Sequence, residues 1–219
     1  MRTIVYVDAF NIYFRMLDKN PALKWLDLKK LCRRLLRPVN QIVGIKYYTA
    51  RVSGRLDADG PRRQQLYLDA LATIPELSMY WGTFLITEKF AGLVKPPNFR
   101  PKTNLAQPWP AVVKVIKVEE KGTDVNLASH LLLDAFQDAY DVAVVLSNDT
   151  DLIEPIRIVT QVLCKPIGLL SPVTNPNPKL CNVSKFIRRI SVSDLAACQF
   201  DNPIVLPNGR LIHKPPQWV

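Results

Sequence analysis

Near its start the chain reads Thr3-Ile4-Val5-Tyr6-Val7-Asp8, an apolar run that ends on a carboxylate. Its β-branched and aromatic residues are typical of a buried strand. A second run, Val142-Ala143-Val144-Val145-Leu146, leads into Ser147-Asn148-Asp149-Thr150-Asp151. Acids that follow strands of separate βα units can meet at one edge of a parallel sheet. The two runs therefore predict a parallel sheet with an acidic site at its edge.

A third acid follows in Lys121-Gly122-Thr123-Asp124, which opens a helical pattern that runs to about Gln137. Thr123 offers an N-cap, and the helix dipole favours an anionic side chain at Asp124. Asn11 lies one turn past Asp8 and brings an amide to the same rim. Clustered carboxylates repel one another unless a cation or a proton sits among them. Oxygen ligands suit Mg²⁺ or Mn²⁺, so the pattern predicts a divalent-metal site that hydrolyses a phosphodiester.

Composition sets the class of protein around this site. The chain has 219 residues, of which 48% are hydrophobic and 22% are charged, as in one soluble domain of moderate size. The balance of 29 basic and 19 acidic residues gives 29 − 19 = +10, with a pI of about 9.6. Such a charge favours an anionic partner such as nucleic acid or an anionic membrane surface, although it can also serve solubility alone.

Several classes of protein are excluded by what the sequence lacks. Apolar stretches fall short of the ~18 residues that span a bilayer, and the first apolar run is too short for a signal peptide. The four cysteines form no CxxC pair and there are two histidines, so zinc-ligand spacing is missing. We therefore expect a cytoplasmic protein with reduced thiols and no membrane segment.

Strand-like and helix-like patterns alternate along the chain, which predicts an α/β fold with a parallel sheet flanked by helices on both faces. The further strands expected are 41–52, 77–86, 112–118 and 167–170, and the further helices are 26–36, 61–74 and 152–163. Residues 88–110 hold five prolines and four basic residues, which predicts an inserted loop. Residues 173–219 predict an irregular C-terminal extension with a hairpin around Asn208-Gly209.

Three motifs carry a resemblance to a known family. Val5-Tyr6-Val7-Asp8-Ala9-Phe10-Asn11, Glu120-Lys121-Gly122-Thr123-Asp124-Val125 and Leu146-Ser147-Asn148-Asp149-Thr150-Asp151-Leu152 resemble the NYN domain family, a branch of the PIN-like nucleases that includes bacterial proteins. The resemblance covers about residues 1–172. It implies a PIN-like, Rossmann-like fold, a divalent metal held by acids, and ribonuclease activity.

The same resemblance assigns roles by matching position. It implies that Asp8, Asp124 and Asp149 bind the metal. It makes Asn11 and Asp151 supporting polar residues of the catalytic site, while Ser147 and Asn148 shape the loop.

One position departs from the family pattern. Related domains often carry a further acid about two turns into the helix that begins at Asp124, where this chain has Ser129-His130. Asp134 lies further on, ~15 Å along the helix axis at ~1.5 Å per residue, too far to share the ion. The departure predicts a smaller metal site. His130 is either a proton shuttle near the site or a structural residue packed on the helix.

Basic residues gather in two places and predict where a nucleic acid lies. One group follows the second strand and the other lies in the insertion; the members are Arg51, Arg55, Arg62 and Arg63, then Lys95, Arg100 and Lys102. Aromatic residues are interleaved in the insertion, and cations with rings suit single-stranded RNA, although a solvated loop has the same composition. Lys121 either neutralises a phosphate or pairs with a carboxylate, and Arg188-Arg189 either extends the basic surface or faces water.

These observations leave three interpretations. The first is a metal-dependent endoribonuclease that binds RNA, with DNA not excluded and with room for a homodimer. The second keeps the fold as an RNA-binding or regulatory module with weak or no catalysis. The third is a phosphatase of the haloacid-dehalogenase kind, which needs a second Asp two residues after Asp8, where this chain has Phe10.

Overall fold

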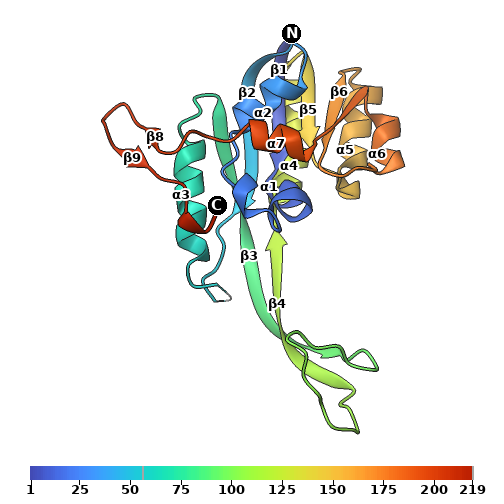
Figure 1. Cartoon of the computed structure of the whole chain (residues 1–219). Coiled ribbons are helices and arrows are strands. Elements are labelled where there is room, and N and C mark those ends of the chain that lie inside the picture. The colour runs from blue at the N-terminus through green and yellow to red at the C-terminus, as the bar shows by residue number, and fades with distance from the viewer. Residues whose placement is uncertain (56, 219) are drawn as a thin grey trace.

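Seven strands form the central sheet of the computed structural model, which describes residues 1–55 and 57–218. Their order is β4-β3-β2-β1-β5-β6-β7, and all neighbours are parallel except the antiparallel pair β3–β4 (Figure 1). The predicted α/β fold class is therefore confirmed. The strand bounds are β1 Arg2–Asp8, β2 Gln41–Ala50, β3 Leu77–Gly92, β4 Val112–Lys121, β5 Val142–Leu146, β6 Ile167–Ser171 and β7 Phe186–Arg189.

Helices cover both faces of the sheet and bury two apolar cores. On one face the core includes residues of α1 Ala9–Ile12, α2 Leu28–Leu35, α3 Gly60–Leu71 and α7 Val192–Ala197. On the other it includes residues of α4 Thr123–Phe136, α5 Ile153–Arg157 and α6 Pro178–Val183. The helix predicted at 152–163 is present as three short pieces, the 3₁₀ turn Thr150–Leu152, α5 and the π-helical turn Ile158–Val162. No helix of the described chain has both the length and the apolar character needed to cross a membrane.

The strand β1 lies in the middle of the sheet with helices over both of its faces. Val5 and Val7 pack into the first core and Tyr6 into the second, and all three are fully buried. A strand covered on both faces has no solvent side, which explains why the sequence of β1 is continuously apolar rather than alternating. The chain leaves β1 toward β2 and β3 on one side and continues from β5 to β7 on the other. The strand order thus reverses between β1 and β5, where open α/β sheets bind ligands.

The hairpin of β3 and β4 projects far beyond the body of the molecule (Figure 1). β3 pairs with β2 only up to Gly82, and from Thr83 to Gly92 it pairs with β4 alone. The expected insertion at 88–110 is therefore partly wrong, because residues 88–92 continue the strand and the connecting loop is 93–111. We call residues 83–121 the arm. The strand expected at 112–118 is present in β4, which pairs with β3 along its whole length.

The chain after residue 172 is more regular than the sequence predicts. β7 pairs in parallel with β6 and extends the central sheet, with α6 between them in sequence. A boundary at residue 172 would therefore cut through the sheet. The hairpin of β8 Ile204–Val205 and β9 Leu211–Ile212 forms as expected, with Gly209 at a positive φ of 79°. The 3₁₀ turns Pro21–Leu23 and Pro216–Trp218 lie nearby, and Trp218 packs against Trp25.

Asp134 has a structural role in the core between the sheet and α4. Its carboxylate lies 2.6 Å from Lys46 Nζ on β2 and accepts a hydrogen bond from the hydroxyl of Tyr6. Both charged side chains are largely buried, at 18% exposed for Lys46 and 10% for Asp134. A buried ion pair with added hydrogen bonds holds its elements in register, and losing one partner strands the other charge.

We predict that Asp134→Ala lowers the free energy of unfolding by about 3–5 kcal/mol, because it leaves the Lys46 ammonium buried without a counter-charge. Urea unfolding followed by circular dichroism measures the change. The double variant Lys46→Met/Asp134→Leu should recover part of the loss. Glu154→Ala, which breaks the exposed pair with Arg157, should change stability by less than about 1 kcal/mol. Equal losses of unfolding free energy in Asp134→Ala and Glu154→Ala would contradict the buried-pair interpretation.

Candidate active site

A serine hydroxyl joins the ends of the two strands at which the sheet order reverses. Ser147 Oγ donates to Asp8 Oδ2 at 2.8 Å and accepts from the backbone N–H of Asp149 at 3.0 Å. Asp8 is 5% exposed and caps α1, because its Oδ1 accepts from the N–H of Asn11 at 2.9 Å. The strand-end acids of β1 and β5 therefore share one hydrogen-bonded junction, as the sequence predicts from their neighbouring strands.

Asn11 connects this junction to the loops around it. Its Oδ1 accepts from the N–H of Asn148 at 3.1 Å, and Asn148 Oδ1 accepts from the N–H of Asn177 at 2.9 Å. Both side-chain oxygens are occupied by backbone groups. Asn11 and Asn148 thus hold the loop after β5 and the segment before α6 in place. The geometry supports a positioning role for both residues.

The carboxylates at this edge act on one another. Asp124 lies at the start of α4, half-buried, and its pKa is raised to about 6, first by burial and then by the charges of Asp8, Asp149, Glu120 and Asp151. Burial also raises the pKa of Asp8, and Asp149 and Glu120 add to the effect, while the hydrogen bonds from Asn11 and Ser147 oppose it. The structure therefore brings together the four aspartates named from the sequence. We call them, with Glu120, the acid cluster.

Glu120 was not assigned a role from the sequence. The expected strand ended at Val118, whereas β4 continues to Lys121, so Glu120 is a strand residue on the same face as Phe84. Its Oε1 accepts from the N–H of Thr123 at 2.9 Å, which fixes the carboxylate beside the first turn of α4. A signal was present, since an acid directly before Lys121-Gly122-Thr123 sits where strand passes to helix.

Two glycines make room for this junction. A Cβ on Gly82 would collide with Glu120 Oε1 and would lie 2.7 Å from the carbonyl oxygen of Lys121, so a larger residue there would force the strands apart. Gly122 has a φ of +98°, a conformation that a residue with a side chain rarely adopts. The turn at Gly122 aims the N-terminus of α4, and with it Asp124, at the acids of β1 and β5.

The donor set suits a hard divalent cation in its chemistry. All of its side chains offer carboxylate oxygens, and the pKa of Asp124 is raised by burial and also by a repulsion that a cation would relieve. As they stand, however, no three acidic, histidine or cysteine side chains within residues 1–55 and 57–218 are arranged to hold one ion together. The metal assignment of Asp8, Asp124 and Asp149 stays a prediction.

Two residues named from the sequence lie away from the acid cluster. His130 packs between tyrosines, with Nδ1 3.1 Å from the hydroxyl of Tyr48 and its ring 4.3 Å from that of Tyr80. Burial and the charge of Lys46 lower the pKa of His130, which favours its structural reading. Lys121 is paired in the hairpin with Thr83, on the face opposite to Glu120, and its Nζ lies 3.8 Å from Glu119. Of its two readings, the carboxylate pair is the one observed.

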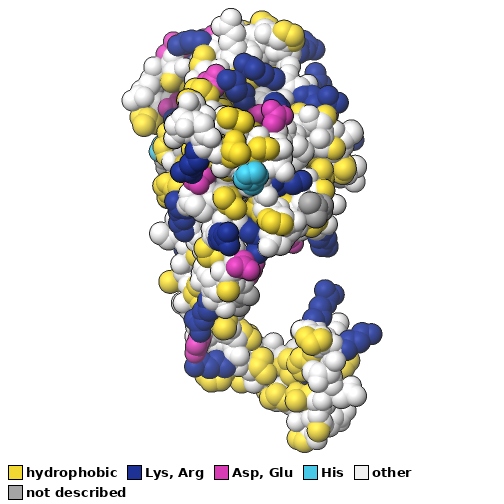
Figure 2. Space-filling model, turned by 60° about the vertical axis from the view of Figure 1, so that its left-hand side comes forward, with side chains coloured by type: hydrophobic (Ala, Val, Ile, Leu, Met, Phe, Trp, Pro, Cys, Tyr) yellow, Lys and Arg dark blue, Asp and Glu magenta, His cyan; other side chains and the backbone are white. Residues whose placement is uncertain are grey.

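The predicted RNA-binding residues divide into engaged and free groups. Arg51 stacks over the ring of Trp81 at 4.4 Å, Arg55 pairs with Glu88 at 3.0 Å, and Arg63 pairs with Asp57. The exposed remainder consists of Arg62 on α3 and Lys95, Arg100 and Lys102 in the loop of the arm. Figure 2 shows a hollow between the body and the end of the arm, with basic side chains of the arm's end at its rim.

Comparisons with known proteins give one curated relative and one solved structure. No family model matches the chain. It is 28% identical over 242 residues to 6-hydroxy-3-succinoylpyridine 3-monooxygenase HspA of Pseudomonas putida (strain DSM 28022 / S16), covering 100% of this chain and 75% of that protein. The crystal structure of VPA0982, a protein of unknown function from Vibrio parahaemolyticus RIMD 2210633, has a TM-score of 0.51 and 13% identity, covering 87% of this chain and 93% of that one. This likeness shows a shared fold.

We predict that Asp124→Asn stabilises the metal-free protein at pH 8 and not at pH 4. A carboxyl whose pKa is raised by folding stabilises the fold below its unfolded value near 4, and loses that contribution as the pH rises through about 6. Because the side chain is half-exposed, we expect a gain of about 1 kcal/mol, or a rise in Tm of ~2–4 °C. Thermal melts in EDTA at the two pH values measure it, with exposed Asp18→Asn as the control. A gain of equal size at pH 4 would refute the charge argument.

Proposed function

We propose that this chain is a metal-dependent endoribonuclease whose site is the acid cluster. The observation that carries the proposal is the convergence of carboxylates from separate elements where the strand order reverses. The strongest charges acting on Asp124 are four carboxylates. Such a set is unfavourable in isolation and favourable around a cation that also binds phosphate.

The chain's residues would divide the reaction among themselves. Asp8, Asp124 and Asp149 would hold Mg²⁺ or Mn²⁺, which when bound would polarise a phosphoryl oxygen and acidify a water molecule. Asp151, exposed on the rim, orients the water, and Glu120 adds a fifth carboxylate beside Asp124. The water oxygen forms a bond to phosphorus as the bond from phosphorus to a ribose oxygen breaks, and the water's proton passes to a carboxylate.

The arm offers the RNA strand two different faces. Alternate residues place Phe84, Ile86 and Phe90 on the face that carries Glu120. Phe84 meets Phe10 edge-on at 5.3 Å, and Phe90 is 72% exposed, so an aromatic row leads outward from the acid cluster. Lys89, Lys117 and Lys121 lie on the opposite face, where the last two pair with Glu119. Rings for stacking and cations for phosphates are the two elements of single-strand binding.

A silent RNA-binding module is the competing form of this proposal. It would keep the arm and lose the metal chemistry, as the Ser129-His130 departure allows. Calorimetric titration with Mn²⁺ distinguishes the two, because a module without a metal site would show no saturable heat. The phosphatase interpretation has less support, since Phe10 packs against Phe84 at the position where that chemistry needs an Asp. Trapping a phospho-aspartyl analogue with beryllium fluoride would revive it.

A second candidate function comes from the curated relative, whose identity extends over all of this chain. The chain would then oxygenate position 3 of a pyridine ring such as that of 6-hydroxy-3-succinoylpyridine. Because that carbon carries the succinoyl group, the new C–O bond from one oxygen atom of O₂ would form as the bond from C3 to the acyl carbon breaks, while a two-electron donor reduces the other oxygen atom to water. Incubation with that substrate, O₂ and a reduced nicotinamide, followed by mass spectrometry of the product, tests this candidate. A pyridine product that carries oxygen from O₂ at position 3 would support it over the nuclease.

We predict that Asp8→Asn, Asp149→Asn and Glu120→Gln each slow RNA cleavage in Mn²⁺ by at least about 100-fold, because each removes a charge from the cluster that holds the ion. Binding of RNA should persist. Cleavage of a fluorescent single-stranded RNA measures the rates. Glu119→Gln is the matched control. Glu119 is next to Glu120 in the sequence, but its carboxylate faces Lys117 on the other side of the hairpin, so its replacement should leave the cleavage rate unchanged. Parental rates in both aspartate variants would rule out the assigned site.

We also predict that the triple variant Lys95→Ala/Arg100→Ala/Lys102→Ala weakens RNA binding and its salt dependence. Each cation that no longer neutralises a phosphate of a single strand lowers the slope of log K against log salt by ~0.7, so three give a change of ~2. Fluorescence anisotropy at several salt concentrations measures the slope. The matched control is Arg33→Ala/Arg37→Ala/Lys185→Ala, whose residues are all exposed and precede β2 or β7 in the chain. An equal change of the salt slope in the two triple variants would indicate that RNA binds through the net charge of the protein alone.

A further inference from the structure

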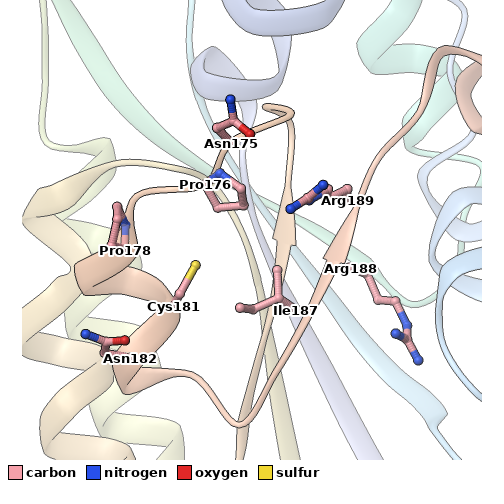
Figure 3. Close-up of a pocket in the computed structure, with 8 residues that line it drawn as sticks. All are labelled: Asn175, Pro176, Pro178, Cys181, Asn182, Ile187, Arg188 and Arg189. Atoms are coloured by element: carbon pink, nitrogen blue, oxygen red, sulfur yellow. The ribbon is translucent and has the colours of Figure 1, made fainter.

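A hollow of about 630 Å³ lies between α6 and β7, beside the acid cluster rather than within it. Its walls include Asn175, Pro176, Cys181, Asn182, Ile187 and Arg189, and Arg188 also lines it, although its guanidinium extends away from the other lining residues (Figure 3). The volume falls within the ~300–1,000 Å³ that small-molecule sites occupy. Arg189 ends β7, and β7 is separated from β5 by β6 alone, so at ~4.8 Å per strand the hollow is ~10 Å from the strand that leads to Asp149.

The two arginines of β7 point in different directions. Successive residues of a strand face opposite sides of a sheet, which places Arg189 on the same side as Ile187 and α6. In Figure 3 the Arg189 side chain reaches toward Pro176 across the hollow, whereas Arg188 extends away from it. Within residues 1–55 and 57–218, neither guanidinium forms an ion pair with a carboxylate. Arg189 therefore presents a cation to the hollow.

The chemistry of the walls matches one class of ligand. A guanidinium binds phosphate through paired N–H donors and also stacks on planar rings. Ile187 and Pro176 give an apolar surface for a ring, and the amides of Asn175 and Asn182 can donate to and accept from the edge of a base. A planar heterocycle joined to a phosphate meets all three features, and that is a nucleotide.

The wall of this hollow is tied to the acid cluster. Asn177 donates its N–H to Asn148, and Asn148 donates its N–H to Asn11, which follows Asp8 on the first turn of α1. The segment that carries Asn175 and Pro176 therefore has a fixed position relative to the acids. A strand with its scissile phosphate at the acids would pass along the carboxyl edge of the sheet toward β7.

We propose that the hollow between α6 and β7 is a nucleotide subsite, which holds the phosphate of a neighbouring nucleotide on Arg189 and its base against Ile187 and Pro176. The proposal rests on the proposed nuclease function and names the part of the substrate that this edge recognises. The arm would bind the RNA strand on one side of the scissile phosphate, and the subsite would bind it on the other. The acid cluster lies between them, because β3 and β7 are on opposite sides of β1 and β5 in the sheet.

The test is nucleotide binding by the metal-free full chain, in EDTA, with adenosine 5′-monophosphate as the probe. We expect Arg189→Ala to weaken binding at least tenfold by calorimetry and Arg188→Ala to change it less than twofold. Asn182→Ala, a milder change in the same wall, should weaken it severalfold. Equal losses in the two arginine variants, or no loss in Arg189→Ala, would overturn the subsite.

A thiol within the hollow supplies an independent readout on the parent protein. Cys181 lines the hollow, whereas the exposed Cys164 lies outside it. The nucleotide should slow alkylation of Cys181 by iodoacetamide, measured by peptide mass spectrometry, and leave Cys164 unchanged. Equal slowing of both thiols, or of neither, would overturn the proposal. Inorganic phosphate and nicotinate are the controls. If either one protected Cys181 as well as the nucleotide does, the hollow would not recognise a base joined to a phosphate, and the proposal would be overturned.

These readouts separate the subsite from the nuclease. Nucleotide binding that depends on Arg189, in a protein that cuts no RNA in Mn²⁺, would keep the subsite and remove the nuclease. RNA cleavage that depends on Asp8 and Asp149, without nucleotide protection of Cys181, would keep the nuclease and remove the subsite.

Discussion

One hydroxyl group, Ser147 Oγ, holds the two strand ends on which the site depends. It donates a hydrogen bond to the buried carboxylate of Asp8 and accepts one from the N–H of Asp149. It therefore stabilises the charge of Asp8 and fixes the loop that follows β5. A buried carboxylate without such donors would be driven to its neutral form. The hydrogen bonds from Ser147 and Asn11 favour the charged form, and burial with two nearby carboxylates opposes them. The site is therefore built as a balance between charge repulsion and a few oriented donors.

This balance is possible because the sheet beneath it is rigid. β1 from Thr3 onward and all of β5 are buried between two helical layers, and helical turns begin directly after Asp8 and Asp149. Repelling groups can be held together only when the surrounding packing overdetermines their positions. The Lys46–Asp134 pair under α4 contributes to that packing, which explains an acid on this helix that takes no part in the acid cluster.

Much of the site follows from the strand-end rule, and the failures have physical reasons. Asp8 and Asp149 follow long apolar runs, so their position at one edge could be predicted from periodicity. The signal for Glu120 is weaker, because the last three residues of β4 are all charged and lack the apolar character typical of a strand, so only its place before Lys121-Gly122-Thr123 points to the site. β7 was missed for a similar reason, since two of its four residues are exposed arginines. Short strands at sheet edges depend on their neighbours more than on their own sequence.

The arm exposes apolar side chains and a free strand edge to which a partner can bind. A two-stranded ribbon is marginally stable in water without a third strand or a packed face, and this one exposes Phe90, Val112 and Ile116. β4 is the edge of the sheet, and its free edge could pair with a second copy of the chain. Lysines at positions 114, 117 and 121 recur along that edge together with Glu119 and Glu120, so two such strands side by side would have to match a pattern of both charges. These lysines pair with Glu88 and Glu119 within the arm, so the cations best placed to meet a polyanion are Lys95, Arg100 and Lys102 of its loop, which form no ion pair within residues 1–55 and 57–218.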